Sequence, residues 1–459
     1  MITLPEELTP ITDHLLAQGC YPVVVGGYLR DILLQQESKD IDIEVYAVKN
    51  FETLQSMLEP FGSVNLVGKS FGVLKLTLGS YELDFALPRK ESKKARGHRG
   101  FNVQLSGQMD FVTAALRRDF TINAIGYDIN SSLLLDPYGG QKDLDSHTLR
   151  CVNEKTFVED PLRILRAIQM AARFNLTCDE SLLKLMQSMV AEGVLSELPK
   201  ERLFGELKKL LLKAVKPSIG FELMDRLGIL DFLPELSALK TTLQDPVYHP
   251  EGDVWTHTLM AIDAMASLRT ENDKRDLTLM LAVLCHDFGK PATTKEIMGR
   301  VRSIGHEEAG IKPAHDFLRR FTDEKRLIDE VLSLVAHHQK PMQFYKQQAK
   351  APAIRRLGMK TNIGDLVIVA KADFLGRESE EAKSGQFPAG VWLLDHATSL
   401  NVSRTAPKPL LQGRDLIAEG IPPSKAFKEV LERAFEAQLD GEFTNRVEAK
   451  MWLKGYLDL

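Results

Sequence analysis

The sequence predicts an α+β multidomain protein, in which an α/β head is followed by a long all-α body. Within the first 150 of the 459 residues, short β-rich segments bounded by Gly, Ser or charged residues alternate with helix-like segments. From about residue 156 onward, apolar residues recur at three- and four-residue spacing, as in amphipathic helices. We expect four parts: a head over 1–150, a helical neck over 151–240, a second helical domain over 241–380 and a helical tail over 381–459.

The individual elements follow from the same patterns. Strands are predicted at residues 23–25, 41–45, 73–76 and 83–86. The clearest helices are predicted at residues 161–174, 201–213, 256–268 and 277–285. Domain breaks are expected near 145–155, 235–250 and 376–390; the last of these stretches is polar and rich in Gly and Pro, as linkers are.

Composition excludes several classes of protein. The chain is 44% hydrophobic and 26% charged, which is ordinary for a soluble globular protein. Its four cysteines lie far apart, which argues against a disulfide framework or a zinc ribbon and fits a reducing cytoplasm. We expect neither a signal peptide nor a membrane partner, because no apolar run approaches the roughly 18 residues that span a bilayer. With a net charge of −5, any nucleic acid must meet a local basic patch.

Two glycines follow the first predicted strand, in the motif GGYLRD at residues 26–31. Glycine lets the backbone approach a ligand closely, and the start of a helix offers free N–H groups to a phosphate. Arg30 would add guanidinium donors to the same phosphate. Taken alone, the glycines favour an ordinary tight strand-to-helix turn.

Asp40 and Asp42 change that interpretation. Residues two apart in a strand point to the same face, so both carboxylates can hold the same cations. Mg²⁺ prefers oxygen ligands, usually one or two carboxylates together with the phosphates of the substrate. An isolated pair of this kind usually lies on a solvated strand face, but here the glycine motif stands just upstream. The combination predicts a site for magnesium and a triphosphate.

These motifs resemble those of the polymerase-β-like nucleotidyltransferases. The motifs LRRDFTINA (116–124) and LDPYGG (135–140) look like those of the class II branch, which contains bacterial tRNA CCA-adding enzymes and bacterial poly(A) polymerases. The resemblance runs through most of residues 20–235. It implies that Asp40 and Asp42 bind magnesium. It also implies nucleotide contacts from Gly27, Arg30, Arg118 and Asp119. Asp84 is either a third carboxylate near the metals or an aspartate with a structural hydrogen bond.

Residues 89–101 carry six Lys or Arg against one Glu and show no periodicity, which predicts a mobile basic loop. A solvated surface loop without function would have the same composition. In relatives that incorporate the terminal A, a flexible loop stands at this place, and the resemblance therefore favours functional mobility.

The neck begins with FVEDPLRILRA at residues 157–167. Pro161 suits a first helical turn and Asp160 its cap, and Asp160 and Arg163 are neighbours on one helix face. Spacing alone favours a capping aspartate with an ordinary ion pair. A carboxylate only accepts and a guanidinium only donates hydrogen bonds, however, so such a pair also fits the edges of cytosine and adenine and rejects guanine and uracil. The resemblance implies this base-selecting role, with Arg166 also on the nucleotide; Lys208, Lys209 and Lys213 either meet tRNA phosphates or form a solvated helix face.

A second site is predicted in the body. His257, the pair His286-Asp287 and Asp373 stand in the order typical of the HD phosphohydrolase superfamily, which residues 245–380 resemble. These side chains suit a divalent transition metal that activates water against a phosphoester. His306 and His337 occupy positions that complete a two-metal site in some HD enzymes. In the family, such modules are linked to 2′,3′-cyclic phosphodiesterase, 2′-nucleotidase and phosphatase activities.

The resemblance therefore predicts a magnesium-dependent tRNA nucleotidyltransferase that adds CCA to the tRNA 3′ end from CTP and ATP. The acceptor would be bound by shape and phosphates along the helical body, with the tail contributing. Addition of only A or only CC is one alternative, and the basic loop argues against CC alone. Poly(A) polymerases usually carry a long basic C-terminal extension, which is not found here. In a third alternative, an HD phosphohydrolase has a head that only docks RNA; Asp40 and Asp42 argue against it. The oligomeric state is left open.

Overall fold

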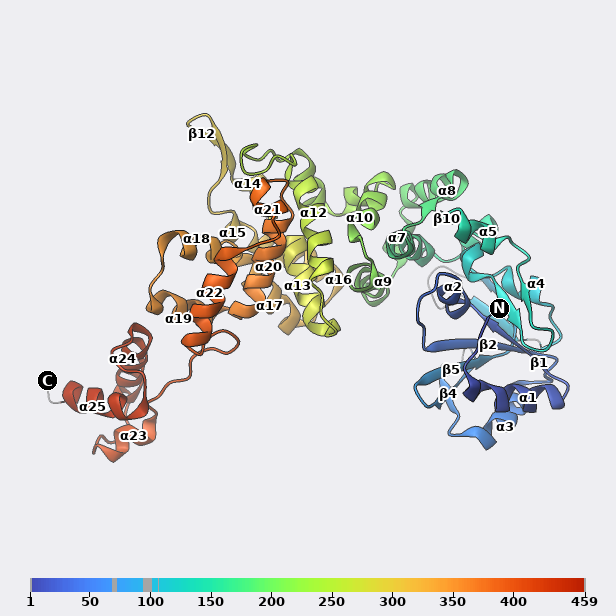
Figure 1. The fold of residues 1–459 in the computed structure, drawn as a ribbon, viewed down its shortest axis with the longest axis horizontal. Coiled ribbons are helices and arrows are strands. Elements are labelled where there is room, and N and C mark those ends of the chain that lie inside the picture. The colour runs from blue at the N-terminus through green and yellow to red at the C-terminus, as the bar shows by residue number, and fades with distance from the viewer. Residues whose placement is uncertain (1, 68–71, 94–100, 106, 458–459) are drawn as a thin grey trace. The chain divides into compact units, whose positions relative to one another are not determined.

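The computed structural model describes residues 2–67, 72–93, 101–105 and 107–457 and contains two compact units (Figure 1). Unit 1 comprises Met1–Leu210 and Ile219–Ile229. Unit 2 comprises Leu211–Ser218 and Leu230–Leu459. An α/β head within unit 1 and an all-α body in unit 2, apart from one short hairpin, confirm the predicted fold class.

The core of unit 1 is a seven-stranded mixed sheet in the order β3-β4-β5-β2-β1-β8-β9. Within it, β2 and β5 run parallel, and the other neighbouring strands are antiparallel. The sequence predicted β1, β2, β4 and β5 but not the three-residue strands β3, β8 and β9. The strands are β1 (Tyr21–Val25), β2 (Asp40–Tyr46), β3 (Asn65–Val67), β4 (Val73–Leu78), β5 (Tyr81–Ala86), β8 (Gly126–Asp128) and β9 (Leu133–Leu135).

Strand β2 positions the acidic residues of the head. Ile41 and Ile43 are buried, whereas Asp40 and Asp42 are exposed, so the alternation that predicted one shared face is present. Asp42 lies opposite Asp84 in the parallel register with β5 and opposite Val25 in the antiparallel register with β1. Because β1 ends at Val25, its following turn begins beside Asp42.

The basic segment over residues 89–101 differs from its prediction. Strands β6 (Arg89–Lys93) and β7 (Phe101–Leu105) pair as a separate antiparallel ladder, so an irregular loop was the wrong prediction for residues 89–93 and 101. All five residues of β6 are polar or charged. The alternation of apolar and polar residues that usually predicts a strand is therefore absent from its sequence. The rest of the predicted loop, residues 94–100, lies outside the described residues.

Helices complete unit 1, and the last two carry the chain between the units. Gly220 of α10 faces Leu210 and Ile168 so closely that a Cβ atom would lie 2.5 Å from a Leu210 methyl group, which allows α10 to pack tightly on α7 and α9. The helices are α1 (Thr9–Ala17), α2 (Gly27–Leu33), α3 (Phe51–Leu58), α4 (Phe111–Ala115), α5 (Gly140–Asp145), α6 (Glu154–Phe157), α7 (Leu162–Phe174), α8 (Glu180–Ala191), α9 (Lys200–Lys213) and α10 (Pro217–Arg226). The two-residue strands β10 (Thr148–Leu149) and β11 (Thr177–Cys178) pair in parallel.

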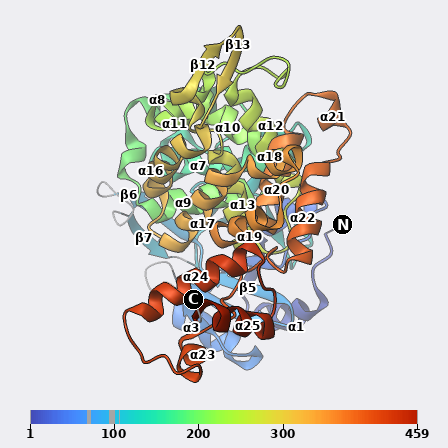
Figure 2. The ribbon, with the colours of Figure 1, turned by 90° about the vertical axis from the view of Figure 1, so that its left-hand side faces the viewer.

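Unit 2 is built around four packed helices: α12 (Val254–Ser267), α13 (Asp273–Cys285), α17 (Lys325–His337) and α20 (Ile363–Leu375). Figure 2 shows α13, α17 and α20 side by side. Ten consecutive residues of α13, from Asp276 to Cys285, are buried, which places its C-terminal end in the middle of the core. Over the described residues, no helix combines the length and apolar character needed to cross a membrane.

The other helices of unit 2 either lie beside these four or belong to the C-terminal tail. The tail has a small core of its own that includes Leu416, Phe443 and Leu453. The helices are α11 (Pro234–Ser237), α14 (Lys290–Thr293), α15 (His306–Ala309), α16 (Ile311–Phe321), α18 (Lys340–Gln347), α19 (Ala351–Lys360), α21 (Glu380–Lys383), α22 (Pro388–Ser399), α23 (Gly413–Ala418), α24 (Ala426–Asp440) and α25 (Arg446–Leu457). A hairpin joins β12 (Thr294–Ile297) to β13 (Arg300–Ser303).

Candidate nucleotide site and candidate metal centre

A pocket of about 370 Å³ in unit 1 collects most of the residues that the sequence singled out. Seven arginines and three aspartates line it, so its charge suits a polyanion such as a triphosphate. The predicted residues in its lining are Gly27, Arg30, Asp42, Arg118, Asp119, Asp160, Arg163 and Arg166. Gly26 of the glycine motif and Arg89 of the basic segment also line the pocket. The other lining residues, to which the sequence assigned no individual role, are Arg117, Asn123, Leu162 and Arg202. Asp40 is absent from the lining and lies two residues before Asp42 on the same strand face.

The carboxylates on this face repel one another. Partial desolvation raises the pKa of Asp42; nearby Arg118 opposes that shift, and the charges of Asp84, Glu44 and Asp40 add to it. The pKa of Asp84 is also raised, mainly by burial, although Lys75 lies 3.5 Å from its Oδ1. A divalent cation next to these oxygens would offset the repulsion, and an all-oxygen donor set fits Mg²⁺.

Gly26 makes the turn between β1 and α2 possible. Its φ of 76° lies in the region that favours glycine. A Cβ atom there would lie 3.1 Å from both Asp42 Oδ2 and Arg118 Nη1, so a larger residue would crowd the carboxylate and the guanidinium. The glycine therefore serves the close approach of these two side chains as well as the turn.

Glu44 anchors two arginines beneath the pocket. It is 3% exposed, and its Oε1 accepts hydrogen bonds from Arg117 Nη2 at 2.7 Å and Arg118 Nη2 at 2.9 Å. Burial alone would raise the pKa of the Glu44 carboxyl, but the two guanidinium groups hold it below its usual range. The sequence DIDIE already puts residues 40, 42 and 44 on one face, and this signal could have identified Glu44.

A buried chain of hydrogen bonds links the head to α7. Arg30 donates to Asp31 Oδ1 and to Asn123 Oδ1, at 2.6 and 2.7 Å, and Asn123 in turn donates to Asp119. The other oxygen of Asp119 accepts a 2.6 Å bond from Arg166 Nε. Burial would raise the pKa of Asp119, but Arg166 and Asn123 keep it lowered. Arg30 and Asp119 thus line the pocket with most of their polar atoms already engaged, and Asp119 fixes the position of Arg166.

Asp160 and Arg163 are held by different partners, not by each other. The Asp160 carboxylate accepts from the Leu162 backbone N–H and pairs with Arg202 of α9 at 2.9 Å. Arg163 donates to two backbone carbonyls, Thr156 O at 2.7 Å and Arg117 O at 2.6 Å. These contacts fix both side chains in the pocket before any ligand arrives. The sequence could not indicate Arg202, which lies 42 residues away.

The lysines of α9 have partners of their own. Lys209 pairs with Glu206 at 2.8 Å, Lys213 lies 3.5 Å from Asp273, and the Lys208 ammonium lies 4.2 Å from the centre of the Phe204 ring. Two of the three are therefore partly neutralised, which weakens the expectation that they meet phosphates.

A second site lies in unit 2, where His257, His286, Asp287 and Asp373 come together in the buried core. Their ligand atoms form two adjoining groups, each within 4.8 Å: His257, His286 and Asp373 in one, and Asp287, His306 and His338 in the other. Asp287 joins them, because its Oδ2 lies 3.1 Å from His286 Nε2 and its Oδ1 lies 3.5 Å from His306 Nε2.

Hydrogen bonds to the backbone orient three of these imidazoles. His286, His306 and His338 each contact a carbonyl oxygen through Nδ1, those of Val283, Ser303 and Val335, at 2.6–2.7 Å. A carbonyl accepts only, so Nδ1 carries a proton in each ring and Nε2 is turned inward, toward the other members of the cluster. The Nε2 atoms of His306 and His338 then lie 3.1 Å apart. His286 Nε2 and Asp287 Oδ1 are buried and make no hydrogen bond within the described residues, which likewise fits a shared cation.

The pKa shifts of His338 and Asp287 favour metal binding. Burial and the neighbouring His306 and His286 lower the pKa of His338 to about 3, so its ring is neutral near pH 7. Burial would raise the pKa of Asp287, but His286 and Lys290 hold it well below its usual range. His257 is different: burial would lower its pKa, but hydrogen bonds with Asp373 and Glu251 raise it.

His338, not His337, belongs to this site. His337 contacts Ser333 O through Nδ1, whereas His338 follows the end of α17, is 1% exposed and reaches the cluster. Adjacent residues on a helix point about 100° apart, so only one of the two neighbouring histidines can face the cluster. The sequence alone does not show which one does. Sequence reasoning also did not identify Glu251, whose Oε1 contacts Nδ1 of both His249 and His257 at 2.8 and 2.9 Å. The motif HDFGK contains Lys290, whose ammonium lies 2.7 Å from Asp287 Oδ2.

Comparisons with known proteins agree with this organisation. The family model for the poly A polymerase head domain matches residues 22–150, the model for the probable RNA and SrmB-binding site of polymerase A matches 175–240, and the HD domain model matches 254–376. The fold resembles the crystal structure of the Bacillus stearothermophilus CCA-adding enzyme in complex with CTP, with a TM-score of 0.69 at 20% identity over 99% of this chain and 98% of the other.

The head fold and the pocket define a nucleotidyltransferase that carries an HD domain. A multifunctional CCA protein of Laribacter hongkongensis is 34% identical over 393 residues, which cover 83% of this chain and 92% of that protein. Another, from Neisseria meningitidis, is 33% identical over 91% of this chain and 98% of its own length. The chain belongs to the family of the multifunctional CCA proteins, which confirms the resemblance inferred from the motifs.

Proposed function

We propose that this protein adds CCA to the 3′ end of tRNA from CTP and ATP without a nucleic-acid template. The observation that carries the proposal is the single pocket that combines Asp42, the arginines of the head and the Asp160–Arg163 pair of the neck. Relatives named multifunctional CCA protein support it. We further propose that the domain boundaries lie near residues 150, 240 and 380.

Asp40 and Asp42 would hold the magnesium ions of the reaction. When bound, the metal activates the tRNA 3′-hydroxyl and stabilises the leaving pyrophosphate. The glycine turn at Gly26 and Gly27 admits the triphosphate close to the backbone, and Arg118, fixed by Glu44, contributes donors to its oxygens. Asp119 acts through Arg166, because both of its oxygens already accept hydrogen bonds.

Asp160 and Arg163 would select the base. Cytosine and adenine present an amino donor beside a ring-nitrogen acceptor, which matches a carboxylate and a guanidinium held in fixed positions. Guanine and uracil present the reversed pattern and would leave both groups unsatisfied. Arg202 holds the Asp160 carboxylate with two hydrogen bonds, so we infer that it positions Asp160 without touching the base.

Incorporation assays with defined tRNA ends test the proposal. We expect tRNA ending at the discriminator base to gain C, C and A, and tRNA ending in CC to gain A, with GTP and UTP rejected. Addition of only A or only CC would instead identify the protein as an enzyme that carries out one part of CCA addition. Failure to extend either tRNA with any nucleotide would overturn it.

Arg163→Ala is expected to lower the preference for CTP and ATP over GTP and UTP by about 10- to 100-fold, because the base edge loses its fixed donor. The measurement is the ratio of kcat/KM values for the four nucleotides. Lys184→Ala, on the exposed face of α8, serves as the control and should keep the wild-type ratios. Equal losses with all four nucleotides would assign Arg163 to structure and contradict base selection.

The cluster in unit 2 supports an accessory phosphohydrolase activity. We propose that His257, His286 and Asp373 hold one divalent transition-metal ion and Asp287, His306 and His338 a second, with Asp287 shared. Metals so placed would supply a nucleophile from water near neutral pH. Lys290 and Arg377, paired with Asp287 and Asp373, add positive charge that suits a phosphoester such as a 2′,3′-cyclic phosphate.

Glu251→Gln is expected to weaken metal binding by about 10- to 100-fold, because the carboxylate fixes the Nδ1 proton of His257 and aims Nε2 at the metal. Calorimetric titration with Mn²⁺ or Ni²⁺ measures the change independently of catalysis. Glu380→Gln, on an exposed helix of the same unit, is the matched control. Unchanged affinity in Glu251→Gln would show that the carboxylate does not orient His257.

A further inference from the structure

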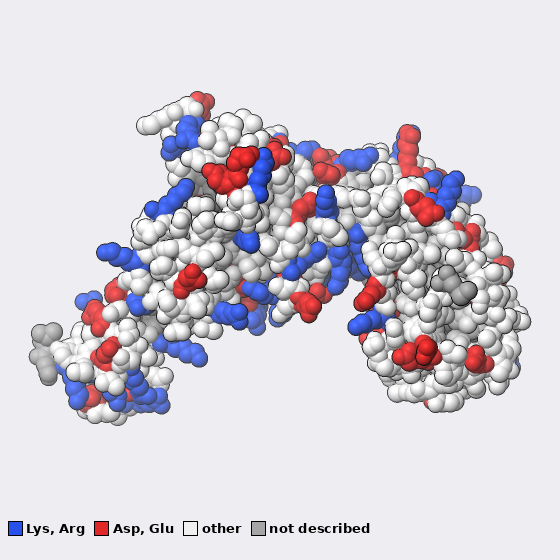
Figure 3. All heavy atoms as spheres, in the orientation of Figure 1, with Lys and Arg blue, Asp and Glu red and all other residues white. Residues whose placement is uncertain are grey.

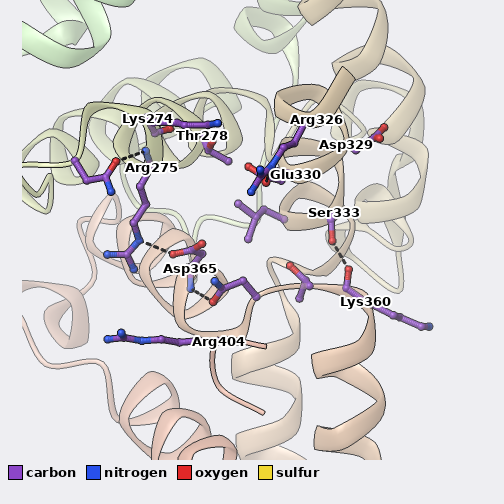
Figure 4. A pocket seen from close by; sticks show the side chains of 14 residues that line it. Lys274, Arg275, Thr278, Arg326, Asp329, Glu330, Ser333, Lys360, Asp365 and Arg404 are labelled. Atoms are coloured by element: carbon purple, nitrogen blue, oxygen red, sulfur yellow. Dashed lines mark hydrogen bonds and ion pairs between the residues drawn. The ribbon is translucent and has the colours of Figure 1, made fainter. Parts of the chain in front are cut away.

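A groove in unit 2 lies outside both sites described above. Its cavity of about 550 Å³ is bounded by α13, α17 and the junction of α19 with α20 (Figure 4). A second cavity of about 690 Å³ shares Arg275, Asp365 and Arg404 with it, so the two form one continuous groove. Its five cationic side chains are Lys274, Arg275, Arg326, Lys360 and Arg404.

Three of these cations have no ionic partner among the residues that the structure describes. Arg275 donates to Asp365 at 2.7 Å, and Arg326 to Glu330 at 2.8 Å. Lys274, Lys360 and Arg404 are exposed and, over the part of the chain that the structure describes, lie within ion-pair distance of no carboxylate. The remaining acidic residue of the lining, Asp329, lies near Arg326 in Figure 4.

The cations stand on two sides of the groove. In Figure 4, Lys274 and Arg326 lie along one side, from α13 and α17, and Lys360 and Arg404 along the opposite side. Figure 3 likewise shows Lys and Arg side chains gathered along the edge of unit 2 where α17 lies. A row of separated phosphates matches this spread better than one small anion, which would be met by converging donors.

The rest of the lining argues against binding through bases. Asn272, Thr278, Ser333, Thr361 and Asn362 offer amide and hydroxyl groups, which hydrogen-bond phosphates and ribose 2′-hydroxyls. No aromatic side chain is among the described residues that line either cavity, so splayed bases have no surface on which to stack. Such a surface suits the backbone of a double-stranded RNA.

We propose that this groove binds the phosphodiester backbone of a base-paired region of the tRNA, away from its 3′ end. The inference rests on the proposed function, and it supplies the local basic patch that a chain with a net charge of −5 needs. The nucleotide pocket would set which nucleotide is added, whereas the groove would hold the acceptor RNA by its backbone, independently of sequence.

The test removes the three unpartnered charges together. The variant Lys274→Ala/Lys360→Ala/Arg404→Ala should bind labelled full-length tRNA about tenfold more weakly in fluorescence anisotropy, because it loses up to three phosphate contacts. The slope of log Kd against log salt concentration should fall by about 2 to 3, since each of up to three lost contacts contributes somewhat less than one. The variant Lys274→Arg/Lys360→Arg/Arg404→Lys, which keeps the charges, should retain wild-type Kd and slope and so separates charge from folding.

A second triple variant, Lys295→Ala/Arg302→Ala/Lys346→Ala, removes the same charge from exposed positions of unit 2 outside the groove. It should keep wild-type binding. Unchanged Kd and slope in the groove variant, or an equal loss in this control, would overturn the groove assignment. Wild-type protein that binds no tRNA and incorporates no nucleotide would instead overturn the proposed function.

Discussion

Asp42→Asn is expected to lower nucleotide incorporation by at least about 10³-fold. The substitution removes one of the two exposed carboxylates on this strand face, and with it the charge that would hold magnesium against the triphosphate. A loss of this size corresponds to about 4 kcal/mol of transition-state stabilisation. The fold should tolerate the change, because Asp42 is exposed and its amide replacement relieves repulsion from Asp84, Glu44 and Asp40.

The measurement is incorporation of labelled CMP and AMP into tRNA, with hydrolysis of a 2′,3′-cyclic nucleotide followed in parallel. Hydrolysis should be unchanged, because Asp42 belongs to unit 1 and the metal cluster to unit 2. Glu52→Gln, an exposed carboxylate on α3, provides the matched control for loss of charge. Incorporation within tenfold of wild type in Asp42→Asn would contradict the metal role and favour an RNA-docking head.

Asp287→Asn is expected to lower phosphohydrolysis by at least about 10³-fold and to leave nucleotide incorporation unchanged. Asp287 belongs to one candidate metal-ligand group and lies 3.1 Å from His286 of the other, so we propose that it binds both ions. In the variant, an amide nitrogen would turn a donor toward a cation. It would also leave Lys290, which is 7% exposed, without its carboxylate partner. Loss of metal should therefore come with some loss of stability.

The test is to dialyse the variant, reload it with metal, and then measure its metal content and its hydrolysis of the cyclic nucleotide. A chelator should abolish wild-type hydrolysis in the same way. Asp316→Asn, a half-buried carboxylate on α16, controls for removal of a carboxylate from unit 2. Full metal loading with retained hydrolysis in Asp287→Asn would rule out a shared ligand.

Most of the correct predictions came from two features of the sequence: the alternation of apolar and polar residues within a strand, and the order of metal-ligand residues along the chain. The pattern D-I-D-I placed two isoleucines in the sheet core and two aspartates outside it, as the structure has them. The order of His257, His286-Asp287 and Asp373 anticipated a cluster whose members come from α12, α20 and the residues that follow α13. Both patterns depend on neighbours along the chain or on a fixed sequence of ligands.

Long-range partners could not be predicted in this way. Asp160 meets Arg202 and not Arg163, because the side chain of Arg163 turns to two backbone carbonyls. Glu44 is buried on the face that leaves Asp40 and Asp42 exposed, because Arg117 and Arg118 cover it. Such choices depend on how elements pack, and the spacing of residues within one element does not contain that information.

A crystal structure of the protein with CTP and magnesium would test the central claim most directly. The account predicts magnesium between the carboxylates of Asp40 and Asp42 and the triphosphate, with the cytosine edge hydrogen-bonded to Asp160 and Arg163. Diverging aspartates, with the cation and the phosphates bound elsewhere, would contradict it.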